Sequence, residues 1–413
     1  MTNPRQLLSA GLVSAEARLA GWTIVLAGSA SLFALLSARW LDVQDRGVVV
    51  VFLTTSSLLM LVGSMGTATG ARVLLNRAPP LGLDTFLHHA RLLSLIHLLT
   101  TATVGVTLLA LSNGMPRVWV AILFIPYAVL TLFSYLSREA LHGLGKHEAA
   151  LLSDVIPSVV QVAAVVLLHA TGRLDLPSLT AAILCSAFVQ ASYLTWRIGT
   201  VSRSPIESFW TLNRVIRFSF PALFTALGQA VVIRVDRLIL GALAGTGAVG
   251  IYGAAATLTE VLWLVPSAVA QLAFRRASVT NRADAGRKSR QIVMGLTLVF
   301  AAAFAVTAHW IIPLLLGPRY VDAIPLSYIL VVAAVPMASY QLDVAVINGM
   351  GRLASSGCIT VTGSLVLAIG CIATIPFYGA FGAAWASLVA YSIEAIWAKT
   401  SLRGTSVLPM TGR

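Results

Sequence analysis

Residues 231–266 read VVIRVDRLILGALAGTGAVGIYGAAATLTEVLWLVP, two apolar runs joined by a glycine-containing turn. Three charged residues, Arg234, Asp236 and Arg237, interrupt the first run. A charge at membrane depth costs at least ~2.5–3.5 kcal/mol on insertion scales, so it is rarely kept without a partner or a purpose. The stretch therefore predicts two membrane-spanning helices, the first of which carries a structural or functional charge cluster.

The rest of the chain has the same apolar character. Of its 413 residues, 58% are hydrophobic and 10% are charged, whereas soluble domains average about 25% charged residues. Apolar runs of roughly twenty residues, long enough to cross a bilayer, recur from end to end. They predict about twelve helices, since a barrel would show short alternating segments. The predicted spans are 20–41, 46–66, 89–112, 118–140, 150–170, 176–197, 214–241, 247–273, 291–316, 323–347, 355–376 and 379–399. The expected fold class is an all-α polytopic membrane protein.

The formal net charge of +13 would indicate nucleic acid as a partner if the chain were soluble. Here most of the basic residues fall on cytoplasmic segments when the N-terminus is placed in the cytoplasm. The densest cluster is Arg275, Arg276, Arg282, Arg287, Lys288 and Arg290. It either orients the chain or attracts anionic lipid headgroups. We expect both termini to be cytoplasmic, membrane lipids as partners, and no nucleic acid.

Patterns for cofactors are missing from the sequence. Cys185, Cys358 and Cys371 fall in predicted spans without metal-ligand spacing, and GLGKH at 143–147 lacks the spacing of a phosphate loop. No metal or nucleotide cofactor is expected. The predicted outer turns are short, which argues against a membrane polymerase or ligase with a large catalytic loop.

A short motif occurs twice in the chain. LHGLGK at 141–146 matches INGMGR at 347–352 in character at all but the second position, with an offset close to half the chain length. A weaker echo links DRGVVV at 45–50 with AVGIYG at 248–253. Each half holds an even number of spans, which preserves orientation.

The repeat predicts two six-helix lobes, residues 1–205 and 206–413, related by a pseudo-twofold axis along the membrane normal. This is a transporter architecture, and alternating access by rocking one lobe against the other follows as a hypothesis.

Arg234 and Arg237 are three residues apart and share one helix face. Two guanidinium groups side by side suit a pyrophosphate, because arginine offers planar, bidentate donors and keeps its charge. Asp236 points away from both, so we expect it to meet a neighbouring helix or to take part in ion coupling. The alternative is a structural ion pair, with Arg237 reaching the outer interface.

Three further carboxylates, Glu260, Asp343 and Glu394, fall inside predicted spans. Intramembrane carboxylates are candidates for function. Glu260 follows the charged helix directly and could face Arg234, either as a salt bridge or as a coupling group. The expected coupling groups or intramembrane charge partners are three carboxylates, Asp236, Glu260 and Asp343.

The stretch 235–266 resembles the polysaccharide flippases of the multidrug/oligosaccharidyl-lipid/polysaccharide superfamily. The likeness rests on the Asp236-Arg237 pair, the turn Gly241 to Gly247, and the helix opening Gly250-Ile251-Tyr252. It continues in LLLGPRYVDA at 314–323, INGMGR at 347–352 and IPFYGAFGAAWAS at 375–387, and covers roughly residues 205–400.

This resemblance implies a flippase that moves undecaprenyl-pyrophosphate-linked oligosaccharide from the inner to the outer leaflet of a bacterial cell membrane. It implies a cationic cavity for the pyrophosphate and glycan, and partners such as polysaccharide polymerase and glycosyltransferases. The alternative is a multidrug and toxin extrusion antiporter, which shares the architecture. Drug-cation cavities favour acidic residues, so Arg234 and Arg237 as substrate-binding residues favour the anionic cargo.

Overall fold

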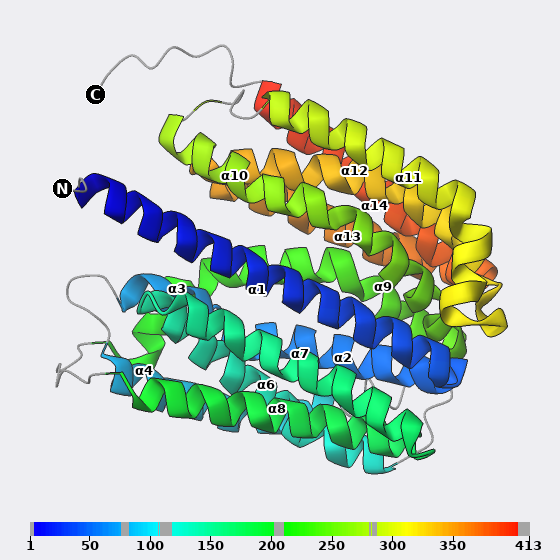
Figure 1. Cartoon of the computed structure of the whole chain (residues 1–413), viewed down its shortest axis with the longest axis horizontal. Helices are drawn as coiled ribbons and strands as arrows, with labels where there is room; N and C mark the ends of the chain where they lie inside the picture. Colours follow the sequence, from blue (N-terminus) through cyan, green and yellow to red (C-terminus); the bar gives the residue numbers. More distant parts are fainter. Residues whose placement is uncertain are drawn as a thin grey trace. The chain divides into compact units, whose positions relative to one another are not determined.

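The structure is a computed structural model, and it describes residues 4–75, 82–105, 107, 118–201, 210–280, 282 and 287–403. All regular elements within these ranges are helices (Figure 1). The first half contains α1 (Pro4–Trp40), α2 (Val43–Ser64), α3 (Thr67–Leu74), α4 (Leu83–Thr100), the π-helix η1 (Thr101–Gly105), α6 (Val118–Gly143), α7 (His147–Ala170) and α8 (Leu176–Gly199).

The second half begins with a long helix, α9 (Leu212–Glu260), which is kinked at Gly245 (φ 84°). Glycine adopts this backbone conformation at little cost, which is why the chain bends there. The remaining elements are η2 (Val261–Trp263), α10 (Leu264–Thr280), α11 (Arg287–Leu316), η3 (Pro318–Tyr320), α12 (Ala323–Gly349), α13 (Leu353–Tyr378) and α14 (Ala380–Arg403).

The helices coincide with the predicted spans. Nine helical segments of the described chain are long and apolar enough to cross a membrane, and one of them, Ala226–Ser278, covers the predicted span 247–273 and residues 226–241 of the span before it. The spans 89–112 and 118–140 correspond to α4 with η1 and to α6, although residues 106 and 108–112 lie outside the described residues. The predicted all-α membrane fold is confirmed.

Contacts divide the chain into two compact units. The N-terminal unit holds the described residues of 1–41, 55–109 and 116–223, and the C-terminal unit holds those of 42–54 and 224–413. Both α2 and the first part of α9 are therefore shared between units. The lobe boundary predicted between residues 205 and 206 lies outside the described residues and stays a prediction.

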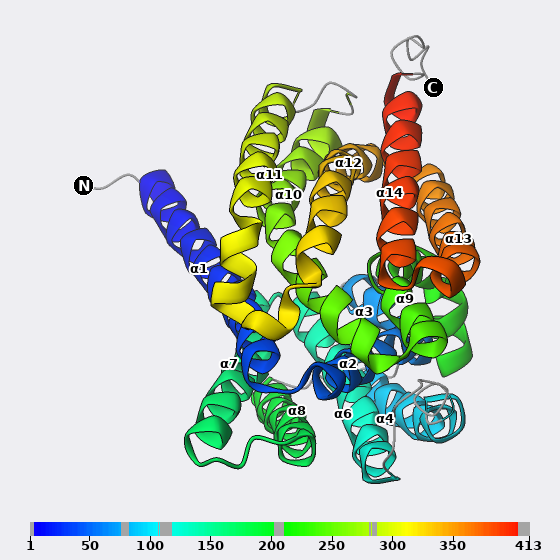
Figure 2. The same cartoon turned by 90° about the vertical axis from the view of Figure 1, so that its right-hand side faces the viewer.

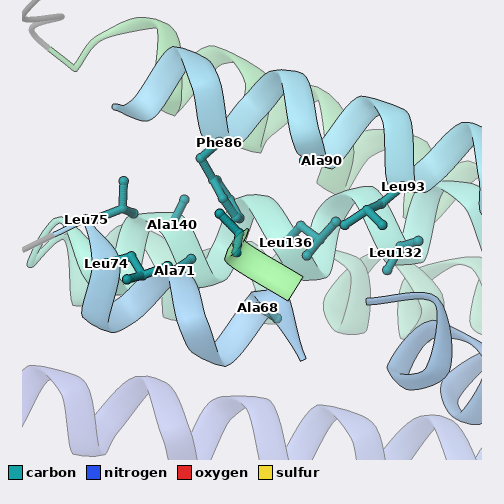
Figure 3. Close-up of a cluster of buried hydrophobic side chains, with 11 residues drawn as sticks. Ala68, Ala71, Leu74, Leu75, Phe86, Ala90, Leu93, Leu132, Leu136 and Ala140 are labelled. Atoms are coloured by element: carbon teal, nitrogen blue, oxygen red, sulfur yellow. The ribbon is translucent and has the colours of Figure 1, made fainter. Parts of the chain in front are cut away.

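Small side chains bring α3, α4 and α6 together in the N-terminal unit (Figure 3). Ala68 and Ala71 of α3 are fully buried against leucines of α6, and Phe86 of α4 fills the same core. A Cβ at Gly70 would meet the Ser219 hydroxyl, so glycine permits the start of α9 to approach α3. In the C-terminal unit, α10, α11, α13 and α14 pack around or beside α12 (Figure 2).

The repeated motif forms the same turn twice. Gly145 has φ 73° and Gly351 has φ 76°. Each is followed by a basic residue of nearly identical geometry, Lys146 (φ −87°, ψ 52°) and Arg352 (φ −85°, ψ 52°). The Lys146 amide donates to the Leu141 carbonyl at 2.9 Å, and the Arg352 amide donates to the Ile347 carbonyl at 3.1 Å. These six-to-one bonds satisfy carbonyls at the ends of α6 and α12.

The second echo, DRGVVV with AVGIYG, forms a helix crossing in the C-terminal unit. A Cβ at Gly47 of α2 would meet the Thr246 carbonyl, and a Cβ at Gly250 of α9 would meet the Val43 carbonyl. Gly47 and Gly250 occupy matching positions in the two segments. Each glycine therefore faces the carbonyl of the residue four positions before the other glycine. Small residues at such a crossing let two backbones approach closely, as in membrane helix pairs.

Candidate functional site

The charged residues of α9 form a buried cluster in the C-terminal unit. Arg237 is 8% exposed, and its guanidinium forms an ion pair with Glu260 across the kink at Gly245. Asp236, 2% exposed, accepts a hydrogen bond from the Arg237 amide at 2.8 Å. Glu260 therefore pairs with Arg237, whereas Arg234 was the partner considered from the sequence.

Tyrosines hold the cluster to the second part of α9 and to α14. Tyr252 donates its hydroxyl hydrogen to Asp236 and lies 3.2 Å from the Ser387 hydroxyl of α14. Tyr391 of α14 donates to the Val232 carbonyl at 3.2 Å. Asp236 is thus bonded to the second part of α9, beyond the kink at Gly245. Tyr252 and Ser387 belong to motifs that the sequence marked, the Gly-Ile-Tyr helix opening and the segment 375–387, whereas Tyr391 had no sequence signal.

A third arginine joins this region from α2. Arg46, in the DRGVVV motif, is 4% exposed, and its Nε has no hydrogen-bond partner among the described residues. It lies close enough to Arg237 and Tyr320 for electrostatic interaction. Tyr320 follows α11 outside the spans, and burial raises its pKa to about 12, so its hydroxyl stays protonated. Arg234 lies on the same helix as Arg237 and is half-buried.

Two other sequence-marked carboxylates lie elsewhere in the C-terminal unit. Asp343 of α12 forms an ion pair at 2.8 Å with Arg290 of α11, which also donates to the Ser339 hydroxyl at 2.9 Å. Glu394 of α14 is fully buried, and neither of its oxygens has a hydrogen-bond partner in the described chain. Its side chain lies against Gly363 of α13, where a Cβ would displace it.

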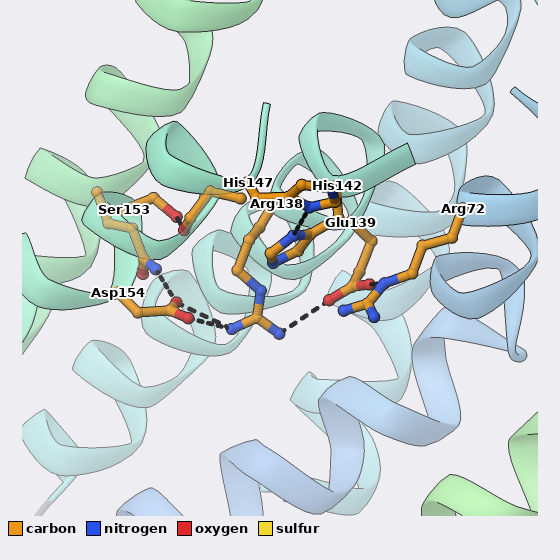
Figure 4. Close-up of polar contacts among 9 residues, drawn as sticks. Arg72, Arg138, Glu139, His142, His147, Ser153 and Asp154 are labelled. Atoms are coloured by element: carbon orange, nitrogen blue, oxygen red, sulfur yellow. Dashed lines mark hydrogen bonds and ion pairs between the residues drawn. The ribbon is translucent and has the colours of Figure 1, made fainter. Parts of the chain in front are cut away.

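A second charge network spans the N-terminal unit, and sequence reasoning missed it (Figure 4). Arg138 of α6 donates to both oxygens of Asp154 on α7, at 2.9 and 2.7 Å. It also bonds Glu139 at 3.2 Å, and Glu139 pairs with Arg72 of α3. Arg138 and Glu139 fall inside the predicted span 118–140 and Asp154 inside the span 150–170, so the presence of charge within a span was the sequence signal that could have found them. Which of the charged side chains on α3, α6 and α7 pair with one another is visible only in the three-dimensional structure.

Asp154 also lines a small polar pocket of about 190 Å³ between α6, α7 and α8. Gln190 donates an amide hydrogen to Asp154 at 3.2 Å, and Gln161 donates to the Ser186 hydroxyl at 2.9 Å. The pocket offers amide and hydroxyl groups to a small polar molecule. Among the residues described, no three His, Cys, Asp or Glu side chains are grouped to hold a metal ion.

The family model for "Polysaccharide biosynthesis protein" matches residues 19–274, more than half of the chain. The chain belongs to this family. The match includes the Asp236, Arg237 and Glu260 cluster and the Arg138 network. It agrees with the resemblance to flippases of the multidrug/oligosaccharidyl-lipid/polysaccharide superfamily drawn from residues 235–266.

Solved structures share the fold of this polysaccharide biosynthesis protein. The lipid II flippase MurJ in its inward closed conformation matches with a TM-score of 0.79 at 12% identity, over 94% of this chain and 87% of that chain. An inward-facing multidrug resistance MATE family transporter of the MOP superfamily matches with a TM-score of 0.72 at 16% identity, over 92% and 96%. A MATE protein in a bent conformation matches with a TM-score of 0.62 at 17% identity, over 95% and 96%.

These similarities identify the fold as that of transporters and flippases, and the chain as a multi-pass membrane protein. No curated protein sequence matches it.

Proposed function

We propose that this protein is a flippase for undecaprenyl-pyrophosphate-linked oligosaccharide. It moves the lipid-linked sugar from the inner to the outer leaflet of a bacterial cell membrane, for cell-surface or exopolysaccharide biosynthesis. Translocation occurs by alternating access and not by covalent chemistry, so the protein is not an enzyme. Both termini lie in the cytoplasm under this proposal, and polysaccharide polymerase and glycosyltransferases are partners in the same process.

The observation that carries the proposal is the excess of buried arginine within the family match. Of the buried charged residues that the structure describes in this region, Arg46 and Arg237 are cations and only Asp236 is an anion. Guanidinium groups bind pyrophosphate through paired hydrogen bonds and stay charged in apolar surroundings. An anionic headgroup would lower the electrostatic cost of these arginines, which a cationic drug would raise.

The contacts suggest different roles for the two arginines of α9. The ion pair with Glu260 orients Arg237 and offsets its charge, so this residue supports the site by fixing the kinked helix. Arg234 lies one turn away, is half-buried, and is the residue we propose to contact the pyrophosphate together with Arg46. Asp236, Glu260 and Asp343 then act as intramembrane charge partners.

The alternative is a cation-coupled extrusion antiporter of the MATE type. The TM-score of 0.72 with a MATE transporter and the buried, unbonded carboxylate of Glu394 favour this second candidate. A transported organic cation or a coupling ion would find its counter-charge there.

The test replaces the native protein by Arg46→Gln plus Arg234→Gln, which leaves the Arg237–Glu260 pair intact. Lipid-linked sugars are then measured separately in each leaflet, with the membrane level of the variant measured in parallel. We expect lipid-linked intermediates to accumulate in the inner leaflet. The control, Arg173→Gln plus Arg319→Gln, removes two exposed charges and should export normally.

Normal export by the double variant would show that these arginines do not bind the cargo. If complete deletion of the protein also leaves the lipid-linked sugars unchanged, the flippase proposal is wrong. Sensitivity of that deletion strain to cationic drugs would then favour the antiporter.

A further inference from the structure

A groove runs between α6 and α8 on the N-terminal unit, with a volume of about 780 Å³. Its walls are apolar and aromatic, and they include Phe133 of α6 and Phe188 and Trp196 of α8. Phe188 and Trp196 are each 62% exposed, although they belong to a membrane-spanning helix. Large apolar side chains exposed on such a helix are solvated by lipid chains.

A second recess of about 400 Å³ lies at the end of this groove, and Thr200 lines both. The recess differs in chemistry, because Lys146 and Arg197 line it. Its floor is packed by Leu141 and Ala149, which belong to one buried cluster of α4, α6, α7 and α8. The two cavities therefore form one surface that is apolar along the helices and cationic at their end.

The two cations of the recess lie near one carboxylate, Glu148, in the first turn of α7. Neither Lys146 nor Arg197 forms an ion pair with any residue that the structure describes. The Nε of Arg197 is buried without a hydrogen-bond partner, and its guanidinium carbon lies 5.5 Å from the centre of the Trp196 ring. The neighbouring carboxylate, Glu148, is already paired with Arg18 at 3.6 Å.

The start of α7 adds to the positive potential. Lys146 is the N-cap residue of this 24-residue helix, and its side chain does not cap the helix amides. The first amides of a helix carry partial positive charge and bind anions such as phosphate. The recess thus combines the side-chain cations of Lys146 and Arg197 with a helix N-terminus. The buried Nε of Arg197 is a hydrogen-bond donor that lacks an acceptor among the described residues.

We propose that this surface binds an anionic phospholipid. The acyl chains lie in the groove between α6 and α8, and the phosphate contacts Lys146 and Arg197. Under the predicted topology this lipid belongs to the cytoplasmic leaflet, where basic pockets between membrane helices recognise anionic headgroups. The groove is open along its length, so it is filled by abundant bilayer lipid in preference to a scarce lipid-linked intermediate.

The proposal is independent of the flippase function, because it concerns other residues in another unit. Trp196 supplies the measurement: the protein is reconstituted with dibrominated phosphatidylglycerol or dibrominated phosphatidylcholine, whose bromines quench nearby tryptophan fluorescence. The contribution of Trp196 is the difference between the native protein and Trp196→Phe. We expect brominated phosphatidylglycerol to be preferred over brominated phosphatidylcholine at this site.

Lys146→Gln plus Arg197→Gln should reduce that preference by roughly tenfold or more, because each basic residue near an anionic lipid contributes about a fivefold factor. The matched control, Arg173→Gln plus Arg319→Gln, removes the same charge from exposed positions outside the recess and should keep the preference. Phe188→Ala should weaken quenching by both lipids, since it removes part of the groove wall. Circular dichroism and thermal unfolding verify that each variant is folded.

Equal quenching by both lipids in the native protein, or an unchanged preference in the Lys146 and Arg197 variant, would overturn the proposal. Competition separates the possible occupants. If undecaprenyl pyrophosphate removes the quenching at concentrations where unbrominated phosphatidylglycerol has no effect, the surface binds the lipid carrier and the phospholipid assignment is wrong. Loss of the quenching on addition of unbrominated phosphatidylglycerol supports the phospholipid assignment.

Discussion

At the residue scale, Arg237 is a buried cation whose charge is balanced by Glu260 from beyond the kink of α9. Burying either charge alone would be costly, because the surrounding helices offer few polar groups to replace water. The pair therefore stabilises the folded C-terminal unit only while both members are present. Asp236 depends in the same way on Tyr252, which donates a hydrogen bond to it.

Glu260→Gln should lower the free energy of unfolding by on the order of 3 kcal/mol, since it leaves the Arg237 guanidinium without its counter-charge. Arg237→Met in the Glu260→Gln background should recover part of this loss, because the unpaired guanidinium is removed, although the buried Asp236 then loses a neighbouring cation. Thermal unfolding in detergent measures both. A double variant as unstable as the sum of the two single variants would show that the pair is not coupled.

His142 should make stability depend on pH. It lies beyond the predicted span 118–140, and burial, followed by Arg72 and then opposed by Glu139, lowers its pKa from 6.5 to about 4. Between these values the unfolded chain binds more protons than the folded protein, so stability falls as the pH drops. The thermal midpoint should fall more from pH 7 to pH 5 in the native protein than in His142→Gln. An equal fall of the thermal midpoint in both proteins would show that His142 is not the source of the pH dependence.

At the element scale, the turns after α6 and α12 depend on glycine for their backbone conformation. Gly145 and Gly351 have positive φ angles, and nothing lies within 4 Å of a Cβ built at either one. Any penalty of substitution is therefore conformational and not steric. The two turns have the same pattern of backbone hydrogen bonds. Replacing glycine by alanine should therefore have the same effect on stability in both halves.

Gly145→Ala and Gly351→Ala should each lower the free energy of unfolding by about 1–2 kcal/mol, the cost of a left-handed conformation for an L-residue. Gly357→Ala is the matched control, because Gly357 is helical in α13 and also has open space at its Cβ. This control should be neutral or stabilising, since alanine is the better helix former. Denaturant titration compares the three, and unequal effects at the two turns would argue against their equivalence.

The crossing of α2 and α9 depends on glycine for a different reason. Gly250 is in a helical conformation, but its Cβ would meet the Val43 carbonyl. Gly250→Ala should push the helices apart and cost on the order of 2 kcal/mol, as overpacking does in cores. Gly253→Ala, one turn further, would place its Cβ 3.4 Å from Val50 and should be tolerated. Equal thermal midpoints for the two variants would refute this account.

At the scale of the whole molecule, the distribution of basic residues predicts the orientation in the membrane. In a variant lacking the native cysteines, Arg173→Cys should react with a membrane-impermeant maleimide added to intact cells. Arg276→Cys should react only after the cells are opened. Both side chains are exposed, so accessibility reports the side of the membrane. The opposite pattern would reverse the topology and place the recess at Lys146 in the outer leaflet.

The number, place and type of the helices followed from the sequence, because about twenty consecutive apolar residues in lipid have helix as their stable form. Gly145 and Gly351 were found as a repeat for a similar reason, since a helix end that needs a positive φ angle selects glycine locally. Arg234, Asp236 and Arg237 stood out because charge is rare in apolar spans. These are properties of short segments, and short segments are visible in a linear chain.

Which charged side chains pair with one another was decided by the tertiary structure. Nothing in the sequence shows that Glu260 pairs with Arg237, or that Arg138 joins Asp154 and Glu139. The adjoining surface of Trp196, Arg197 and Lys146 likewise depends on how α6, α7 and α8 pack together. Pairing across helices depends on their rotation and crossing, which many distant contacts set jointly. Sequence alone therefore determined which residues need a partner, and only the fold determined which partner each one has.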